Sequence, residues 1–375
     1  MYKKIVFLTG TRADFGKLKP LIQILQNRSD FEVHLFVTGM HLNPLYGYTL
    51  LEIQKSGFKN IHTFKNTTCE TTMELTLAKT IEGFSSFIKQ HQPDLIVVHG
   101  DRVEALAGAI VGSLNNRLVA HVEGGELSGT IDELIRHAVS KLSHLHFVSN
   151  EEAKMRLLQM GEIDDSIAVI GSPDVDVMFS NTLPNLETAK SYYEIPFENY
   201  AIALFHPITT EIEQMNVYVK EWVKGLIKTD KKYLLVYPNN DLGSSIILKE
   251  YEKLKGNSNF RILPSLRFEY FLTLLKNADF IIGNSSAGIR EAPYYGVSTI
   301  NIGSRQKNRV SHIVIQNIVC LSDQIVEAVE VLIGNNNREI VQPFGTGKSA
   351  KLFLSTILGN KTWNINHQKQ FLDNS

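Results

Sequence analysis

Charged residues follow several short apolar runs of this sequence, at the points where the runs end. The stretch DLIVVHGD (94–101) ends in Asp101, and RLVAHVEGG (117–125) contains Glu123 directly after its apolar part. Neither strand end needs an acid for folding, so we interpret both carboxylates as candidates for proton transfer. Carboxylates gathered in one partly desolvated site have separated pKa values, so that one can act as a base and another as an acid.

A third acid follows in the stretch HVEGGELSGTIDELIRH (121–137). Asp132 precedes Arg136 by four residues, which places both on one face of a predicted helix. For Asp132 alone, an ion pair on a solvated helix would be the better interpretation. The alternative is that Asp132 joins the other carboxylates, with Arg136 either orienting it or meeting a phosphate.

The first turn, GTRADFGK (10–17), has the features of a phosphate-binding turn without the G-x-G-x-x-G fingerprint. Gly10 permits a tight turn, and the amides at the start of the following helix can meet an anion. Arg12 and Lys17 would add positive charge. An ordinary turn with a solvated arginine is the alternative.

A similar arrangement occurs in the second half of the chain, in GNSSAGIREAP (283–293). Ser285 and Ser286 stand where a helix should begin, and their hydroxyls suit a diphosphate, while Glu291 can accept hydrogen bonds from a ribose. An ordinary serine N-cap is the alternative. His206, at another strand end, can pair with a phosphate or can be satisfied by local backbone.

Two patterns in the sequence resemble known sites but fail on inspection. GTGKSA (345–350) has the ending of a phosphate-binding loop, but Gln342 stands where that motif needs glycine. His144 and His146 alternate at the start of a strand, without an HExxH motif or paired cysteines to support zinc. The sequence therefore predicts neither an ATPase nor a metal site.

A parallel sheet would position these residues. Continuous apolar runs separated by helical patterns are typical of strands that are buried on both faces of such a sheet. In one helical pattern Leu18, Leu21, Ile22 and Leu25 are spaced at i, i+3, i+4 and i+7, with Pro20 expected near the first turn. Strands are expected within 3–10, 31–39, 94–101, 117–125, 145–150, 167–172, 200–207, 232–240, 279–286 and 297–304.

The repeat of this pattern predicts an α/β protein of two Rossmann-like, doubly wound domains, and 375 residues suit two cores. We expect a hinge near 172–190 and domains at 1–172 and 173–360, with the segment 361–375 packing back on the first. Ligands bind outside the carboxyl ends of parallel strands, so the candidate residues are expected to converge in a cleft between the domains.

The composition limits the partners and the compartment. With 43% hydrophobic residues, 21% charged residues and a formal charge of -1, the chain has no basic excess for nucleic acid or an anionic membrane. Cys69 and Cys320 are far apart, which favours free thiols in a reducing compartment. The N-terminal apolar run of four residues is too short for a signal or a membrane span. We expect a cytoplasmic protein with a small partner.

The motifs together resemble one enzyme family. GTRADFGKLKPL, VHGDRVEALAGA, HVEGGELSGTIDELIRHAVSKLSH, FHPITTE, YPNND, GNSSAGIREAP and GSRQ are similar in order and spacing to the hydrolysing UDP-N-acetylglucosamine 2-epimerases of sialic acid biosynthesis. The resemblance spans roughly residues 3 to 375. Non-hydrolysing relatives typically carry GTRPE in the first turn, whereas Ala13-Asp14 resembles the hydrolysing branch.

The resemblance implies a GT-B fold, a UDP-sugar substrate, no cofactor, no metal and a homodimer. The reaction it implies is the conversion of UDP-N-acetylglucosamine and water to N-acetylmannosamine and UDP. The predicted catalytic residues are Asp101, Glu123, Asp132 and His206. The predicted UDP-binding residues are Arg12, Lys17, Arg102, Arg136, Asn239, Ser285, Ser286, Glu291 and Arg305.

Three other functions share features with this one. The same chemistry on a UDP-2,4-diacetamido-2,4,6-trideoxy-glucose, as in legionaminic acid synthesis, stays open because the contacts around C4 and C6 cannot be read from the sequence. A retaining glycosyltransferase shares the GT-B fold but does not call for three acids. A non-catalytic nucleotide-sugar sensor would not need Asp101, Glu123 and Asp132 together.

Overall fold

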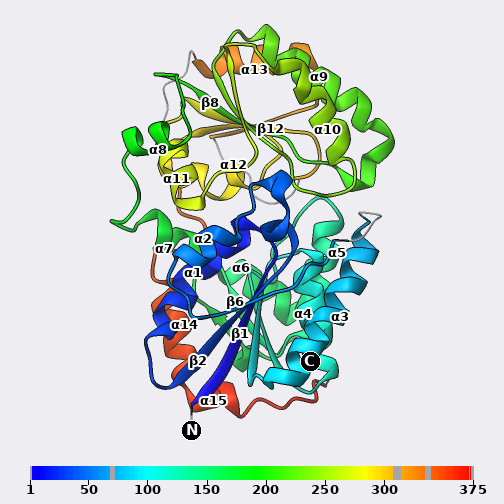
Figure 1. Cartoon of the computed structure of the whole chain (residues 1–375), viewed down its shortest axis with the longest axis vertical. Helices are drawn as coiled ribbons and strands as arrows, with labels where there is room; N and C mark the ends of the chain where they lie inside the picture. Colours follow the sequence, from blue (N-terminus) through cyan, green and yellow to red (C-terminus); the bar gives the residue numbers. More distant parts are fainter. Residues whose placement is uncertain (1, 68–71, 307–313, 334–338, 371, 373–375) are drawn as a thin grey trace. The chain divides into compact units, whose positions relative to one another are not determined.

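The protein is described from a computed structural model, which covers residues 2–67, 72–306, 314–333, 339–370 and 372. Cys69 lies outside the described residues. The chain forms two compact units, each built on a parallel sheet (Figure 1). Unit 1 comprises 1–126, 132–180 and 344–375, and unit 2 comprises 127–131 and 181–343.

Unit 1 contains a seven-stranded sheet in the order β3-β2-β1-β4-β5-β6-β7, with every pair parallel. This is the doubly wound order of a Rossmann-like domain, with one further strand. The strands are β1 (Lys3–Thr9), β2 (Phe31–Val37), β3 (Asn60–Thr63), β4 (Leu95–His99), β5 (Leu118–Val122), β6 (Leu145–Val148) and β7 (Ile167–Val169). The helices are α1 (Arg12–Gln26), α2 (Leu50–Lys55), α3 (Met73–His91), α4 (Val103–Leu114), α5 (Ile131–Leu142), α6 (Glu151–Gln159), α7 (Pro173–Met178), α14 (Ser349–Leu358) and α15 (Asn360–Trp363).

The two faces of this sheet have separate helical covers. Alternate residues of β1, such as Ile5 and Phe7, pack with α1, α2 and α14 in one apolar core. On the other face α3 packs on α4, and Phe36 of β2 contacts Phe84 and Phe87 of α3. Because side chains alternate along a strand, each strand of the sheet contributes to both cores.

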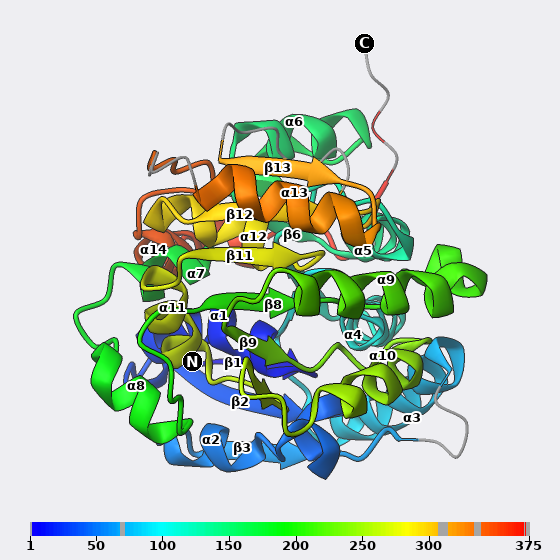
Figure 2. The ribbon, with the colours of Figure 1, turned by 90° about the horizontal axis from the view of Figure 1, so that it is seen from above.

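Unit 2 repeats this design with six parallel strands in the order β10-β9-β8-β11-β12-β13. The strands are β8 (Ala201–Leu204), β9 (Tyr233–Val236), β10 (Phe260–Leu263), β11 (Phe280–Gly283), β12 (Ser298–Ile302) and β13 (Ile315–Ile318). The helices are α8 (Leu186–Tyr192), α9 (Met215–Lys228), α10 (Ser244–Tyr251), α11 (Phe268–Lys276), α12 (Ala287–Arg290) and α13 (Ser322–Ile333). One core holds side chains of α9, α10 and α13 and the other those of α8 and α11, so the helices cover both faces (Figure 2).

All ten predicted strands are present, whereas β3, β10 and β13 were not predicted. These three are edge strands, and most of their residues are only partly buried. An edge strand does not need the continuous apolar run that identifies a central strand. The expectation for Pro20 was wrong, because α1 already begins at Arg12 and the proline lies inside the helix.

The unit boundaries differ from those expected from the sequence. Unit 1 extends through residue 180, whereas its end was expected at residue 172. It also includes the chain from residue 344 onward, whereas the segment that packs on it was expected to begin at residue 361. The reason is packing: α7 and α14 both contact α1, and Phe353 of α14 is fully buried against Phe7 and Phe147. Among the described residues, no helix has the length and apolar character needed to cross a membrane.

Candidate active site

Glu123 of unit 1 is a buried carboxylate at the carboxyl end of β5. Its backbone has a φ of +66°, a left-handed conformation that residues other than glycine seldom adopt. The carboxylate Oε1 accepts a hydrogen bond from Ser172 Oγ at 2.8 Å and lies 3.3 Å from Lys17 Nζ. His99 Nε2 lies 3.3 Å from the same oxygen. A buried acid in a costly backbone conformation is typical of a functional site.

Lys17 reaches this group from α1. Its ammonium is buried and also lies 3.5 Å from Asp174 Oδ2 at the start of α7. The positive charge of Lys17 therefore offsets the negative charges of Glu123 and Asp174, because an unpaired buried charge is energetically costly. The sequence predicted Lys17 as a phosphate ligand, whereas the structure places it between Glu123 and Asp174.

Asp101 follows β4, the neighbour of β5 in the sheet. The register pairs His99 with Val122, and the Gly100 amide donates to the Val122 carbonyl at 2.9 Å, so Asp101 and Glu123 leave adjacent strand ends. The sequence reasoning expected these two acids at one edge of a sheet, and the structure brings the strand ends together there.

Arg136 of α5 forms an ion pair with Asp101 and also donates to the Glu126 carbonyl at 3.2 Å. Its side chain is only 1% exposed. Burial lowers the pKa of Arg136, but the nearby Asp101 carboxylate, followed by Glu126, Glu123 and Asp132, more than offsets this, and the net pKa is raised. Asp132 therefore contributes to the field around Arg136, although the ion pair is made by Asp101.

The first turn is closed by its own side chains. Thr11 caps α1, and the amides of Gly10 and Thr11 donate to the Asp14 carboxylate at distances of 3.0 to 3.2 Å. Burial raises the pKa of Asp14, but hydrogen bonding and charge from His41 outweigh it, so that the net pKa is lowered. The Asp14 carboxylate thus pairs with the two amides before α1, and the phosphate contact expected at the helix start stays a prediction.

The two other arginines of unit 1 that were predicted as site residues also have acidic neighbours. Arg12 Nη2 lies 2.5 Å from Glu52 Oε1, and Arg102 Nε lies 3.9 Å from Glu104 Oε2. Both were predicted to contact UDP. A phosphate would therefore compete with these carboxylates for the two guanidinium groups.

In unit 2, His206 follows β8 and Asn284 follows the neighbouring β11. The Asn284 side chain accepts from the His206 amide at 2.6 Å and donates to its carbonyl at 2.9 Å. Gly283 makes this approach possible, since its φ is +133° and an added Cβ would lie 1.8 Å from the Leu204 carbonyl oxygen. His206 Nδ1 accepts from the Asn239 amide at 3.0 Å, so the neutral ring carries its proton on Nε2.

The other predicted residues of unit 2 lie around Asn284. Arg305 Nη1 donates to the Asn284 carbonyl at 3.2 Å. Ser285 and Ser286 stand directly before the short helix α12, where the Ser285 hydroxyl accepts from the Ala287 amide at 3.3 Å. Glu291 is buried and follows the last residue of α12. The structure thus assembles arginine, serine and histidine groups in this unit.

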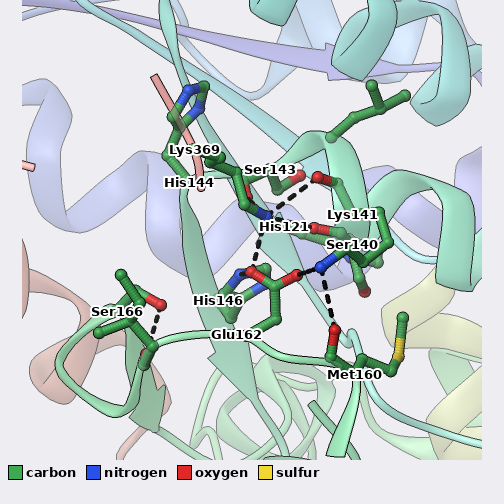
Figure 3. Close-up of polar contacts among 12 residues, drawn as sticks. His121, Ser140, Lys141, Ser143, His144, His146, Met160, Glu162, Ser166 and Lys369 are labelled. Atoms are coloured by element: carbon green, nitrogen blue, oxygen red, sulfur yellow. Dashed lines mark hydrogen bonds and ion pairs between the residues drawn. The ribbon is translucent and has the colours of Figure 1, made fainter. Parts of the chain in front are cut away.

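His144 and His146 have structural hydrogen bonds, as predicted. His146 Nε2 lies 2.9 Å from Glu162 Oε2, and burial is the first cause of its lowered pKa. The Lys369 ammonium donates to the same carboxylate, which also pairs with Lys141 (Figure 3). Although burial raises the pKa of Glu162, its hydrogen bonds with His146, Lys141 and Lys369 lower the net pKa to about 2.

Three residues of these two groups of side chains, one group in each unit, were not among the predicted site residues. Ser172 and Asp174 were read as part of a linker, and Asn284 was not selected. Their position could have identified them, because each is a polar residue that follows a strand of its sheet directly or closely. The Asp176 carboxylate accepts from the first amides of α14, at Ser349 and Ala350, which agrees with rejecting a phosphate loop at 345–350.

Two doubly wound units with parallel sheets define an α/β protein of the GT-B type. The UDP-N-acetylglucosamine 2-epimerase family model matches residues 23–358, and the chain belongs to this family. It is 47% identical over 99% of both chains to the UDP-N-acetylglucosamine 2-epimerase of Neisseria meningitidis. It is 31% identical, over 94% of each, to the hydrolyzing UDP-N,N'-diacetylbacillosamine 2-epimerase of Legionella pneumophila.

Among solved structures, the chain is similar to the UDP-GlcNAc 2-epimerase of Methanocaldococcus jannaschii in complex with UDP-GlcNAc and UDP. The TM-score is 0.81 at 25% identity, over 94% of this chain and 99% of the other. Fold and family therefore agree.

Proposed function

We propose that this protein is a hydrolysing UDP-N-acetylglucosamine 2-epimerase, which converts UDP-N-acetylglucosamine and water to N-acetylmannosamine and UDP for sialic acid biosynthesis. The observation that carries the proposal is the pair of carboxylates at adjacent strand ends, Asp101 beside buried Arg136 and Glu123 beside buried Lys17. The 47% identity to the Neisseria enzyme supports the substrate, and the name of the Legionella relative supports hydrolysis.

We assign UDP to unit 2. Ser285, Ser286 and Arg305 offer hydroxyls and a guanidinium for the diphosphate, and Glu291 offers a carboxylate for ribose hydroxyls. His206 suits a phosphate oxygen because its neutral ring carries the proton on Nε2. The UDP contacts expected in unit 1, at Arg12, Lys17, Arg102 and Arg136, stay predictions.

The chemistry requires both leaving-group stabilisation and proton transfer. The proton at C2 of the sugar is not next to a carbonyl, so its removal must be coupled to departure of UDP from C1. Positive groups stabilise the charge developing on the departing diphosphate, and the carboxylates stabilise the cationic character at C1.

A carboxylate among Asp101, Glu123 and Asp132 then takes the C2 proton, which leaves a glycal with a double bond between C1 and C2. Water adds to C1, and a proton adds to C2 from the opposite face, giving the inverted sugar.

The deciding experiment is turnover of UDP-N-acetylglucosamine in deuterated water, followed by NMR. Release of UDP with N-acetylmannosamine deuterated at C2 is the expected result. Formation of UDP-N-acetylmannosamine without free UDP would replace the proposal with non-hydrolysing epimerisation. Turnover of the UDP-2,4-diacetamido sugar alone would favour the second candidate, which the 31% identity to the Legionella enzyme supports.

We also propose a cytoplasmic homodimer. Burial raises the pKa of the Cys320 thiol to about 12, which suits an unreactive cysteine in a reducing compartment. Light scattering after size exclusion would test the dimer, because a single species with a mass near 42.2 kDa would contradict it.

A further inference from the structure

Three histidines of unit 1 meet at the edge of its sheet, away from the strand ends that carry the acids. His34 lies on β2, His62 on the edge strand β3, and His91 is the last residue of α3. One ring nitrogen from each lies within 4.8 Å of the other two. We propose that these histidines bind one divalent transition-metal ion of the zinc type.

The backbone explains why the three rings meet. β2 and β3 pair in parallel with Phe36 opposite His62, so His34 and His62 project from the face that α3 covers. On α3, His91 follows Phe87 by one turn and stacks on it at 4.4 Å between ring centroids. Phe87 also contacts the His34 and His62 rings edge-on. This aromatic surface restricts the orientations of all three imidazoles.

The spacing of the nitrogen atoms suits a metal. His34 Nδ1 and His62 Nε2 are 3.0 Å apart. Two imidazole nitrogens bound to one tetrahedral zinc ion are separated by about 3.3 Å, given zinc to nitrogen bonds of about 2.0 to 2.1 Å. A shift of a few tenths of an ångström would therefore let the ion replace the proton that the two rings share. The centroid of the His91 ring lies 5.3 Å from that of the His34 ring and 4.5 Å from that of the His62 ring.

Glu32 supplies the outer interaction that metal-binding histidines usually have. Its Oε1 lies 2.6 Å from His34 Nε2. When His34 carries its proton on Nε2, the lone pair of its Nδ1 points toward His62. The hydrogen bond from Nε2 to the Glu32 carboxylate makes Nδ1 a better metal ligand. Lys4, whose ammonium lies 3.7 Å from Glu32 and donates to the His91 carbonyl, holds this carboxylate and the end of α3 in place.

The protonation of the cluster is also compatible with a metal. Burial, followed by the charges of His91 and His34, lowers the pKa of His62. Burial, followed by His34 and Lys4, lowers the pKa of His91. Both rings are therefore neutral near pH 7, which is the form that coordinates metals. His62 and His91 are partly exposed, so water can complete the coordination.

The test is metal titration of the full chain after removal of any affinity tag and treatment with a chelator. Calorimetry with Zn²⁺ should give one ion per chain, and Co²⁺ should give visible absorption bands of a nitrogen-rich tetrahedral site. His62→Gln and His91→Gln should each weaken binding by at least about 10-fold, and Glu32→Gln by about 10-fold. His367→Gln, which changes an exposed histidine, should leave binding unchanged.

Two results would overturn the proposal. One is a wild-type protein that takes up no ion at one per chain, and the other is a bound ion whose affinity is unchanged in both histidine variants. If a variant does not fold, X-ray absorption of the zinc-loaded wild type decides, since the proposal requires three imidazole ligands and fails with fewer. The readouts are independent of epimerase activity.

Discussion

Arg136 holds Asp101 by an ion pair in which the guanidinium is buried and the carboxylate is 20% exposed at its strand end. The arginine also donates to the Glu126 carbonyl, which gives its guanidinium a second point of attachment. The carboxylate is thereby oriented by a group that cannot itself give up a proton near neutral pH.

Replacing Arg136 with methionine should destabilise unit 1 by about 3 kcal/mol, because a buried charge partner is removed while the Asp101 carboxylate remains. Urea unfolding would measure this as a lower midpoint. Lys361→Met is the matched control, since Lys361 pairs with Asp165 and both side chains are largely exposed. That substitution should cost about 1 kcal/mol or less. Equal losses in the two variants would contradict a special role for the buried pair.

Asp101→Asn should lower kcat by about 100-fold or more, because the amide cannot accept a proton from the sugar or return one. The dissociation constant for UDP should stay within about threefold, since the residues to which we assign UDP lie in unit 2. Steady-state kinetics and calorimetry with UDP would separate the two quantities. Asp165→Asn, at an exposed position, serves as the control. A normal kcat in Asp101→Asn would remove this residue from the mechanism.

Gly283→Ala should prevent unit 2 from folding correctly and abolish UDP binding. An added Cβ would lie 1.8 Å from the Leu204 carbonyl oxygen, and the φ of +133° is unfavourable for alanine. Gly256→Ala is the control, because Gly256 also has a positive φ, of +83°, but open space around its Cβ. It should cost only about 1 kcal/mol. Normal UDP affinity in Gly283→Ala would show that the close approach of β11 and β8 is not needed.

The stability of unit 1 should fall as the pH is lowered from about 6.5 toward 3. Burial lowers the pKa of His121 to about 3, although its hydrogen bond with the Gly100 carbonyl acts in the other direction. Because the folded pKa is below the ordinary value of 6.5, the unfolded chain binds more protons in this window, so acid favours unfolding. Above pH 6.5 the contribution of His121 to the free energy of unfolding is fully present.

His121→Gln should flatten this pH dependence, measured as urea midpoints between pH 7 and pH 5. This range lies above the ordinary pKa of 4.5 for Glu162, whose own acid-sensitive contribution is lost between about pH 4.5 and 2. His367→Gln, at an exposed position, should keep the wild-type slope. An unchanged slope in His121→Gln would contradict the assignment.

The sequence predicted the central part of each sheet and the placement of several site residues. Buried parallel strands must be apolar over their whole length, so β1, β4, β5, β8 and β11 were recognisable, and the polar residues following them were natural candidates. The helix spacing of Leu18 to Leu25 was equally clear, and all four of these leucine and isoleucine side chains are fully buried. An edge strand such as β3 lacks the continuous apolar run. It has a neighbouring strand on one side, so its side chains need not be apolar over the whole length of the strand.

The sequence by itself determined two doubly wound units, their acidic strand ends and the family, since these depend on local periodicity and on ordered motifs. Only the tertiary structure decided which charges pair. The Asp14 carboxylate accepts from the Gly10 amide, and Lys17 lies between Glu123 and Asp174. Arg136 pairs with Asp101, although Asp132 is nearer to it in the sequence. Ion pairs and histidine clusters join residues far apart in the chain, and their distances depend on packing that sequence spacing does not encode.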